Sequence, residues 1–391
     1  MIKEKNKIAR QSAIVFVCDF PQGLALRVLD VYNFFRRHPR IILVRRTPQI
    51  SIDRRLVLLS ETIPLPMLTL ERRDPLGRVL AITAALGYLL YSLVLYVRLR
   101  RIKANIRLVH AHYIFPQGLL GLLLARFLRV PLVVTASGTD VNLMMPSSSI
   151  LRAACFFVLR NAYATVAVSK PLQNRLRQYQ VPNCVYIPNS IDVDSIPPVK
   201  ESNAETWLLF VGSMTENKQP FVMLRAFRRV LEQEPTTILI MCGDGPLRGA
   251  VEQEIRERNL QDNVKFFPRL SPMRLNEVRS RASVFVLPSL SEGLSLALLE
   301  ALAAGQIVVA SRNESHAAIL EQGVNALLFE PGDSEQLAQQ ILLAISNKAV
   351  RSRISRAARH LCTTQFSSAV VANQVEDLYL RAISNHLTKV S

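Results

Sequence analysis

The sequence has few cysteines and no arrangement of them that would hold a metal or a disulfide framework. The chain of 391 residues has five, an odd number, at Cys18, Cys155, Cys184, Cys242 and Cys362. Their spacing does not fit a zinc site, so we expect buried free thiols in a reducing compartment. The N-terminus also lacks the layout of a signal peptide, which makes the cytoplasm the expected location.

Acidic residues are scarce in the first half of the chain. Residues 1–199 contain 27 Lys and Arg against 10 Asp and Glu, whereas residues 200–391 contain 21 against 20. A basic half-molecule attracts nucleic acid or the anionic face of a bilayer. The arginine pairs lie among apolar runs and not in a nucleic-acid motif, so we expect an anionic membrane surface and no nucleic acid as partner. A solvated basic face without any partner is the alternative.

One long stretch without charge needs separate treatment. Residues 79–97 are 19 uncharged residues flanked by arginines on both sides, long enough to be a candidate membrane span. A span is disfavoured because the stretch lies between strands of one predicted sheet, parts of which would then lie on opposite sides of the bilayer. A helix in the membrane interface is favoured, and a helix packed inside the domain is the other alternative.

Short apolar runs alternate with helix-like segments in both halves, which predicts an α/β fold with parallel sheets. The predicted strands are residues 12–19, 41–45, 107–111, 132–136, 165–168, 185–187, 207–211, 237–242, 264–267, 283–287, 307–310 and 326–329. A polar linker at residues 197–203 separates two doubly wound, Rossmann-like domains that would face each other across a cleft. We expect a membrane-facing domain at residues 1–196 and a second domain at 197–361. A C-terminal helix within 362–391 would return toward the first domain.

The strongest local motif combines two glutamates with a glycine at the start of a helix. Glu292 and Glu300 are eight positions apart, about 12 Å along a helix, comparable to the distance from a sugar ring past a diphosphate to a ribose. Gly293 lets the backbone approach closely, and free N–H groups at the helix start suit a diphosphate. Two glutamates at this spacing are common, however, and an N-capped helix with one stray glutamate fits the bare pattern.

The surrounding residues strengthen the motif. Phe285-Val286-Leu287-Pro288-Ser289 leads into Glu292-Gly293, and Leu299-Glu300-Ala301-Leu302-Ala303-Ala304-Gly305 follows. In order and spacing this resembles the Glu-x7-Glu signature of the family-4 retaining glycosyltransferases of GT-B fold. The resemblance extends from about residue 12 to residue 366. It implies that Glu292 contacts the donor sugar and that Glu300 holds the ribose.

Other donor-side landmarks follow from the same resemblance. Phe210-Val211-Gly212 followed by Lys218 is similar to the family's strand and loop whose lysine pairs with the diphosphate. Cys242-Gly243-Asp244-Gly245-Pro246 resembles its Gly-x-Gly-Pro turn near the nucleotide. The implied donor-binding residues are Gly212, Ser213, Lys218, Gly243, Gly245, Glu292, Gly293, Leu294, Ser295 and Glu300. Asp192-Val193-Asp194 resembles a hinge turn, so neither a metal ion nor a cofactor is expected.

On the acceptor side, residues 109–112 and 133–142 match loops of the family. The implied acceptor-side residues are Gly23, His112, Ser137 and Asp140. For His112, a structural role with a bond to a backbone carbonyl fits equally well. The residues expected to carry catalysis are Glu292, Lys218 and Ser137.

Four positions depart from the family pattern. Ser137 replaces a frequent histidine near the transferred sugar, and Ser213 replaces an arginine that pairs with the diphosphate, a loss of about 1.5–3 kcal/mol of donor stabilisation. Asn189-Ser190 replaces Asn-Gly, and Ser311-Arg312-Asn313-Glu314 replaces a Gly-Gly loop. Activity remains expected because, in the mechanism proposed for such enzymes, the leaving phosphate takes the acceptor's proton. The protein then has to position the substrates and stabilise charge.

These observations predict a glycosyltransferase of cell-surface polysaccharide or glycolipid synthesis. It would transfer a sugar from a nucleotide-sugar to a lipid-linked or saccharide acceptor, with retention, while bound peripherally to the inner face of the cell membrane. A degenerate, non-catalytic partner with the same fold and a sugar-nucleotide epimerase of GT-B fold are the alternatives. The donor base, the sugar, the acceptor and the oligomeric state do not follow from the sequence.

Overall fold

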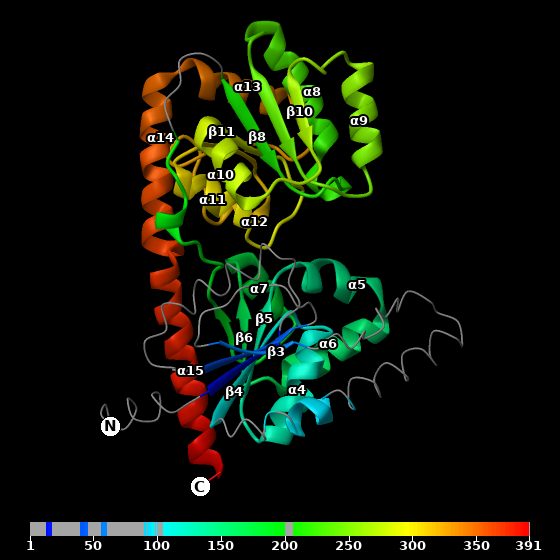
Figure 1. Cartoon of the computed structure of the whole chain (residues 1–391), viewed down its shortest axis with the longest axis vertical. Coiled ribbons are helices and arrows are strands. Elements are labelled where there is room, and N and C mark those ends of the chain that lie inside the picture. Colours follow the sequence, from blue (N-terminus) through cyan, green and yellow to red (C-terminus); the bar gives the residue numbers. More distant parts are fainter. Residues whose placement is uncertain are drawn as a thin grey trace, which may run out of the picture. The chain divides into compact units, whose positions relative to one another are not determined.

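The computed structural model describes residues 13–17, 40–45, 56–60, 90, 92–97, 99, 105–199 and 206–390. The chain forms two compact units. Unit 1 comprises Met1–Pro188 and Ala372–Ser391, and unit 2 comprises Asn189–Val371 (Figure 1). Each unit is built on one parallel sheet with helices, which confirms the predicted α/β class.

Unit 1 contains a seven-stranded sheet in the order β3-β2-β1-β4-β5-β6-β7. Its strands are β1 (Ala13–Val17), β2 (Arg40–Arg45), β3 (Leu56–Ser60), β4 (Ile106–His112), β5 (Leu132–Ala136), β6 (Ala164–Ala167) and β7 (Cys184–Tyr186). Its labelled helices are α4 (Gln117–Leu128), the π-helix η1 (Asp140–Met144), α5 (Met145–Ser147), α6 (Ser149–Asn161) and α7 (Lys170–Gln178). The strand order reverses direction between β1 and β4, the kind of place where open α/β sheets bind ligands.

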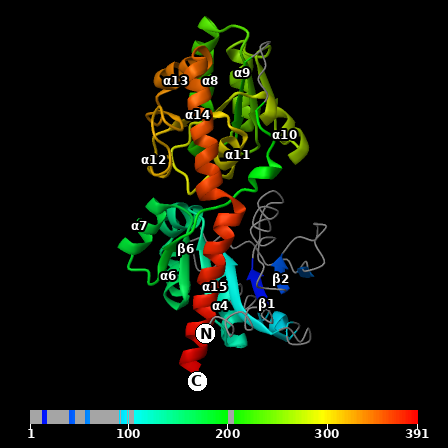
Figure 2. The ribbon, with the colours of Figure 1, turned by 90° about the vertical axis from the view of Figure 1, so that its left-hand side faces the viewer.

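The side chains of β4 alternate between the two faces of this sheet, as strand geometry requires. Ala111 faces α4, where a Cβ added to Gly121 would lie 3.0 Å from the Ala111 Cβ. His110 faces the other way and meets Tyr379 of α15 (Ser368–Val390). The unit 1 part of α15 thus covers one face of the sheet, and α4 covers the other (Figure 2).

Unit 2 contains a six-stranded sheet in the order β10-β9-β8-β11-β12-β13. Its strands are β8 (Trp207–Val211), β9 (Ile238–Cys242), β10 (Val264–Phe267), β11 (Val284–Leu287), β12 (Ile307–Ser311) and β13 (Leu327–Phe329). Its helical elements are the 3-10 helices η2 (Val193–Ser195) and η3 (Glu216–Lys218), then α8 (Pro220–Gln233), α9 (Arg248–Glu257), α10 (Pro272–Arg281), α11 (Leu296–Ala304), α12 (Glu314–Ala317), α13 (Ser334–Ser346), α14 (Lys348–Leu361) and the π-helix η4 (Cys362–Phe366). A continuous apolar core between sheet and helices includes Phe210, Phe227 and Phe329, all at most 1% exposed.

The apolar runs predicted the strands closely, with one omission. Strands β5, β8 and β10 have the predicted limits, and most of the others differ by one or two residues at an end. Strand β3 was not predicted. Among the described strands it lies at the edge of the sheet next to β2, and its four apolar residues, Leu56 to Leu59, form a run too short to stand out between charged neighbours.

Two sequence features lie partly outside the described residues. In the uncharged stretch at 79–97, residues 90 and 92–97 are described, and they are helical. Among all the described residues, none of the helices combines the length and the apolar character that crossing a bilayer would take. Four of the five cysteines are buried free thiols, and Cys18 lies outside the described residues.

Candidate functional site

The loops after β8 and β9 are joined backbone to backbone. The Gly212 N–H donates to the Cys242 carbonyl at 3.0 Å, and the Met214 N–H donates to the Asp244 carbonyl at 3.0 Å. A Cβ at Gly243 would lie 1.8 Å from the Gly212 carbonyl oxygen, and one at Gly245 would lie 2.6 Å from that of Met214. Both glycines are therefore required sterically, and they bring the two predicted donor loops together at the carboxyl edge of the sheet.

Lys218 lies beside this junction. It ends η3, and Gln219 follows in the left-handed region at φ 53° before α8 begins. The aliphatic stem of Lys218 passes over Gly212, since a Cβ there would meet its Cδ at 3.4 Å. The ammonium forms an ion pair with the Glu292 carboxylate, and the two side chains are 17% and 11% exposed. The structure thus brings together two motif residues that lie 74 positions apart in the sequence.

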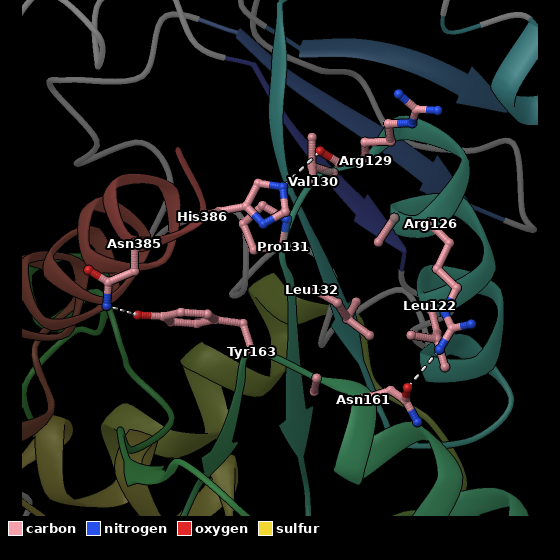
Figure 3. A pocket seen from close by; sticks show the side chains of 12 residues that line it. Leu122, Arg126, Arg129, Val130, Pro131, Leu132, Asn161, Tyr163, Asn385 and His386 are labelled. Carbon is pink, nitrogen blue, oxygen red and sulfur yellow. Dashed lines mark hydrogen bonds between the residues drawn. The ribbon is translucent and has the colours of Figure 1, made fainter. Parts of the chain in front are cut away.

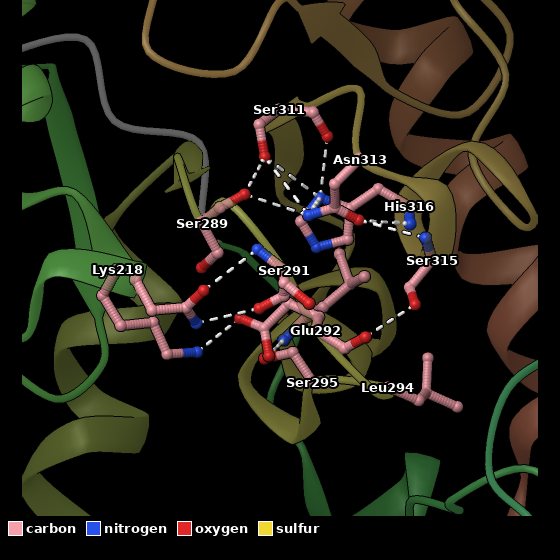
Figure 4. A network of polar contacts seen from close by, with 12 residues as sticks. Lys218, Ser289, Ser291, Glu292, Leu294, Ser295, Ser311, Asn313, Ser315 and His316 are labelled. Atoms are coloured by element: carbon pink, nitrogen blue, oxygen red, sulfur yellow. Dashed lines mark hydrogen bonds and ion pairs between the residues drawn. The ribbon is translucent and has the colours of Figure 1, made fainter. Parts of the chain in front are cut away.

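The loop that carries Glu292 is fixed from two sides (Figure 4). Asn217 brackets Ser291: its amide donates to the Ser291 carbonyl at 2.9 Å and its oxygen accepts from the Ser291 N–H at 3.1 Å. On the other side the Ser315 hydroxyl donates to the Glu292 carbonyl at 2.7 Å. The loop then enters α11, whose N-cap Ser295 accepts from the Leu298 N–H. Glu292 is therefore presented by a rigid loop at a helix N-terminus, where unpaired N–H groups favour an anion.

Residues at the end of β12 and directly after it also contact this loop (Figure 4). The Asn313 amide and the Ser311 hydroxyl both donate to the Ser289 carbonyl, at 3.0 and 2.5 Å. His316 donates from Nδ1 to the Ser311 carbonyl at 2.8 Å, which leaves its buried Nε2 without a hydrogen-bond partner. Burial lowers the pKa of His316, an effect that the nearby Glu292 charge partly opposes. The loop that replaces the family's Gly-Gly is thus a polar scaffold for Glu292.

Glu300 is buried inside unit 2 together with a cation. It lies on α11 at 5% exposed, and its carboxylate forms an ion pair with Arg279 of α10. Arg279 is 1% exposed and donates a second bond to Asn276 on its own helix. A buried carboxylate is costly unless it is paired, so Arg279 is what permits a charge at position 300.

The carboxylate of the predicted acceptor-side residue Asp140 accepts hydrogen bonds from four backbone N–H groups. Its Oδ1 accepts from the N–H groups of Ser137, Gly138 and Val141 at 3.0–3.1 Å, and its Oδ2 accepts from that of Ile114 at 3.1 Å. Complete burial raises its pKa, and these bonds act in the opposite direction. Asp140 therefore ties the loop after β4 to the loop after β5. Ser137 lies half-buried on the second loop, where its side chain bonds to Tyr113.

The histidines of β4 are buried. His110 lies 2.5 Å from the Tyr379 hydroxyl through Nδ1 and 2.8 Å from the Thr135 hydroxyl through Nε2. The His112 ring stacks on that of His110 at 4.3 Å between centroids. Burial lowers the pKa of His112 to about 3 and that of His110 well below its usual range. Both rings are therefore neutral at physiological pH.

Two family models match adjacent parts of the chain. Residues 53–195 match the model described as Glycosyltransferase Family 4, and residues 193–361 match Glycosyl transferases group 1. The chain belongs to the family-4 glycosyltransferases. The predicted GT-B fold is thereby confirmed, in agreement with the two parallel-sheet units and the solved structures below.

Curated relatives of this glycosyltransferase have low sequence identity but align over most of the chain. An uncharacterized glycosyltransferase of Methanocaldococcus jannaschii is 27% identical over 64% of this chain and 68% of its own. The N-acetyl-alpha-D-glucosaminyl L-malate synthase of Bacillus anthracis is 25% identical over 71% of this chain and 75% of its own.

Solved structures share the fold at lower identity. The sucrose-phosphate synthase of Thermosynechococcus elongatus covers 98% of this chain and 100% of its own, with a TM-score of 0.72 and 19% identity. The Anabaena protein HepE in complex with UDP-glucose covers 94% and 98%, with a TM-score of 0.69 and 17% identity.

In this glycosyltransferase the structure gathers most of the predicted donor residues into one region of unit 2, around the loops after β8, β9 and β11. Ser213 is exposed on the β8 loop, where the family's arginine would stand. Gly23 lies outside the described residues. The individual roles of these residues in binding and catalysis stay predictions.

Sequence analysis missed Arg279 and His316. No local signal distinguishes Arg279 from its neighbours Arg274 and Arg281, because a helix turns only one of the three inward. The polar sequence from Ser311 to His316 was noted only as a departure from Gly-Gly, although Asn313 before a short helix has the form of an N-cap.

Unit 1 also contains a cavity of about 300 Å³ between the C-terminal part of α4 and α15 (Figure 3). The Arg126 guanidinium donates to the Asn161 oxygen at 2.6 Å, and His386 donates to the Arg129 carbonyl at 3.0 Å. None of the predicted site residues lines it. It lies at the amino end of β5, opposite the carboxyl edge where ligands of such sheets bind.

Proposed function

We propose that this glycosyltransferase moves a hexosyl group from a nucleotide-sugar to a lipid-linked or saccharide acceptor, with retention of configuration, at the cytoplasmic face of the cell membrane. The observation that carries the donor side is the pair of ion pairs at α11, Lys218 with Glu292 and Arg279 with Glu300. The distant structures solved with UDP or UDP-glucose make a uridine nucleotide the first donor to test.

Each donor-side group has a defined task in this proposal. The Lys218 ammonium has three N–H donors, so it can bind the diphosphate while it keeps Glu292 in place. Glu300, held by Arg279, accepts from ribose hydroxyls. The start of α11 supplies N–H groups to the diphosphate.

The chemical step needs no protein base. The bond from the anomeric carbon to the phosphate oxygen breaks, the acceptor oxygen bonds to that carbon on the same face, and the leaving phosphate oxygen takes the acceptor's proton. Lys218 and the helix start stabilise the negative charge that develops on the diphosphate. Ser137, whose side chain bonds to Tyr113, then serves to position the sugar.

Calorimetric titration with UDP, GDP and ADP tests the donor side. We expect saturable binding of one nucleotide, weakened about 10- to 100-fold in Lys218→Met because a charge-assisted contact to phosphate is lost. The exposed Glu330→Gln is the matched control and should bind as the wild type does. Failure of the wild type to bind any of the three nucleotides would favour the degenerate partner instead.

Product analysis separates the transferase from the epimerase. With the nucleotide-sugar that binds and a lipid-linked acceptor, the product's anomeric configuration, read by NMR, should equal that of the donor. Conversion of the donor into an epimeric nucleotide-sugar without acceptor would contradict the proposal.

A further inference from the structure

Three helices lie side by side on one face of the unit 1 sheet. They are α4, α6 and the helical residues Leu90, 92–97 and Leu99, called the Leu90 helix below. Tyr96 of the Leu90 helix packs on Phe127 of α4 at 5.8 Å between ring centroids, and α4 in turn contacts α6 (Figure 1). Right-handed crossovers into β4, β5 and β6 place all three on the same face. The opposite face is the one covered by α15.

Two of these helices, the Leu90 helix and α6, expose apolar side chains. Four side chains of the Leu90 helix that share one face at helical spacing are strongly exposed: Leu90 at 64%, Leu93 at 46%, Val94 at 41% and Val97 at 44%. The other side of that helix is buried against the unit, with Leu95 and Leu99 at most 3% exposed. On α6, Ile150 and Phe157 are 50% and 49% exposed, two turns apart, with the exposed Ala153 between them.

The segment of the chain that carries these helices is strongly basic. Between residues 75 and 191 the sequence has 13 Lys and Arg and a single acidic residue, Asp140. Asp140 is fully buried, so it contributes no exposed carboxylate. Four exposed arginines flank the apolar side chains. Arg126 is on α4, Arg129 directly follows α4, and Arg152 and Arg160 are on α6. An apolar strip bordered by arginines, in a described part of the chain (residues 105–191) that exposes no acidic side chain, is complementary to an anionic bilayer, whose headgroups are negative and whose interior is apolar.

We propose that this three-helix face is the membrane-docking surface of the enzyme. Leu90, Leu93, Val97, Ile150 and Phe157 enter the boundary between headgroups and acyl chains, and the four arginines contact lipid phosphates. The helices lie in the plane of the interface and do not cross the bilayer. This surface gives the residues through which the enzyme of the proposed function would contact the membrane. The inference depends only on unit 1 and holds whether or not a donor binds in unit 2.

A vesicle co-sedimentation experiment tests the surface with the whole chain. Vesicles of phosphatidylcholine alone and of equal parts phosphatidylcholine and phosphatidylglycerol are the probes. We expect the wild type to partition at least about tenfold more strongly into the anionic vesicles. Leu93→Gln with Phe157→Gln should lower that partition about tenfold, and Arg152→Gln with Arg160→Gln should lower it about fivefold per arginine and reduce its salt dependence.

The matched control is Met273→Gln with Arg274→Gln on α10 of unit 2, which removes a 77% exposed methionine and an exposed arginine. It should leave partitioning unchanged. Equal binding to both vesicles, or an equal loss in the control, would overturn the proposal. So would a wild-type dimer in sedimentation velocity that the Leu93 and Phe157 variant dissolves, because the face would then cover a second copy. Nucleotide titration of the same variants keeps the donor question separate, since their UDP, GDP and ADP binding should equal that of the wild type.

Discussion

The carboxylates of the predicted donor residues in unit 2 and the carboxylate of Asp140 in unit 1 are held in different ways. In unit 2 the buried or half-buried carboxylates Glu292 and Glu300 are each paired with a cationic side chain from another element. In unit 1 the buried carboxylate of Asp140 is occupied by four backbone N–H groups, and His110 and His112 are neutral. A side-chain ion pair can be shared with an incoming ligand, whereas a carboxylate filled by its own backbone cannot. The ion pairs of the predicted donor residues are therefore open to exchange with a ligand, whereas Asp140 is committed to joining the loops after β4 and β5.

The largest effect is expected from Arg279→Met. It leaves Glu300 buried without its cation, which should lower the free energy of unfolding of unit 2 by about 3–5 kcal/mol. The single tryptophan, Trp207, lies in unit 2 beneath the Arg281 guanidinium at 3.9 Å, so its fluorescence in a urea titration reports this unit. Adding Glu300→Gln should restore most of the stability but not nucleotide binding.

The exposed Arg274→Met on the same helix is the control for that experiment. A loss in Arg279→Met no larger than in this control would show that the buried pair adds little. The contrast between the two units would then have no energetic basis.

A smaller loss is expected in unit 1 from Asp140→Ala, about 3 kcal/mol, because four backbone N–H groups lose their acceptor. The variant Asp140→Asn separates the effect of the charge from that of the hydrogen-bond geometry. Its oxygen can keep the three bonds of Oδ1, and its amide would oppose only the Ile114 N–H, so about one bond is lost. Hydrogen exchange should show the Gly138 and Val141 amides deprotected in the alanine variant and protected in the asparagine variant. Equal deprotection in both would mean that the charge, and not the geometry, holds the loops.

The sequence predicted twelve of the thirteen described strands and the loops that follow β8, β9 and β11, because both depend on local patterns. Buried parallel strands are short apolar runs, and Glu292, Glu300 and Lys218 lie in motifs with fixed spacing. The contact between Lys218 and Glu292 was not predictable, since it follows from the neighbouring positions of β8 and β11 in the sheet. The same limit applies to Arg279, whose inward direction depends on how α10 packs against α11.

The acceptor side shows a different limit. Asp140 and His112 were named as acceptor-side residues from the resemblance, but burial and backbone bonding depend on tertiary packing that a motif does not contain. Their roles toward an acceptor stay predictions, and the groups they contact could only come from the structure. The exposed strip of the Leu90 helix is a similar case, because the uncharged stretch at 79–97 did not reveal which of its faces is buried.

The smallest expected effect is a difference between the two units in how their stability depends on pH. The pKa of His112 is about 3 in the folded state against an ordinary value near 6.5, so only the unfolded chain binds the proton between these values. Stability therefore falls as the pH drops below about 6.5, by up to about 1.4 kcal/mol per pH unit for each such histidine. Among the residues that the structure describes, unit 1 has two histidines with lowered pKa values and unit 2 has one, His316.

Unit 1 should accordingly lose stability faster than unit 2 between about pH 7 and about pH 5. The measurement is urea unfolding followed by far-UV circular dichroism for the whole chain and by Trp207 fluorescence for unit 2. His112→Phe keeps a ring stacked on His110 and removes one titrating group, so it should flatten the pH dependence of unit 1 and leave the fluorescence transition unchanged. If the pH dependence of this variant has the same slope as that of the wild type, His112 takes up its proton in the folded protein as readily as in the unfolded one. The pH dependence would then give no support to the contrast between the two units.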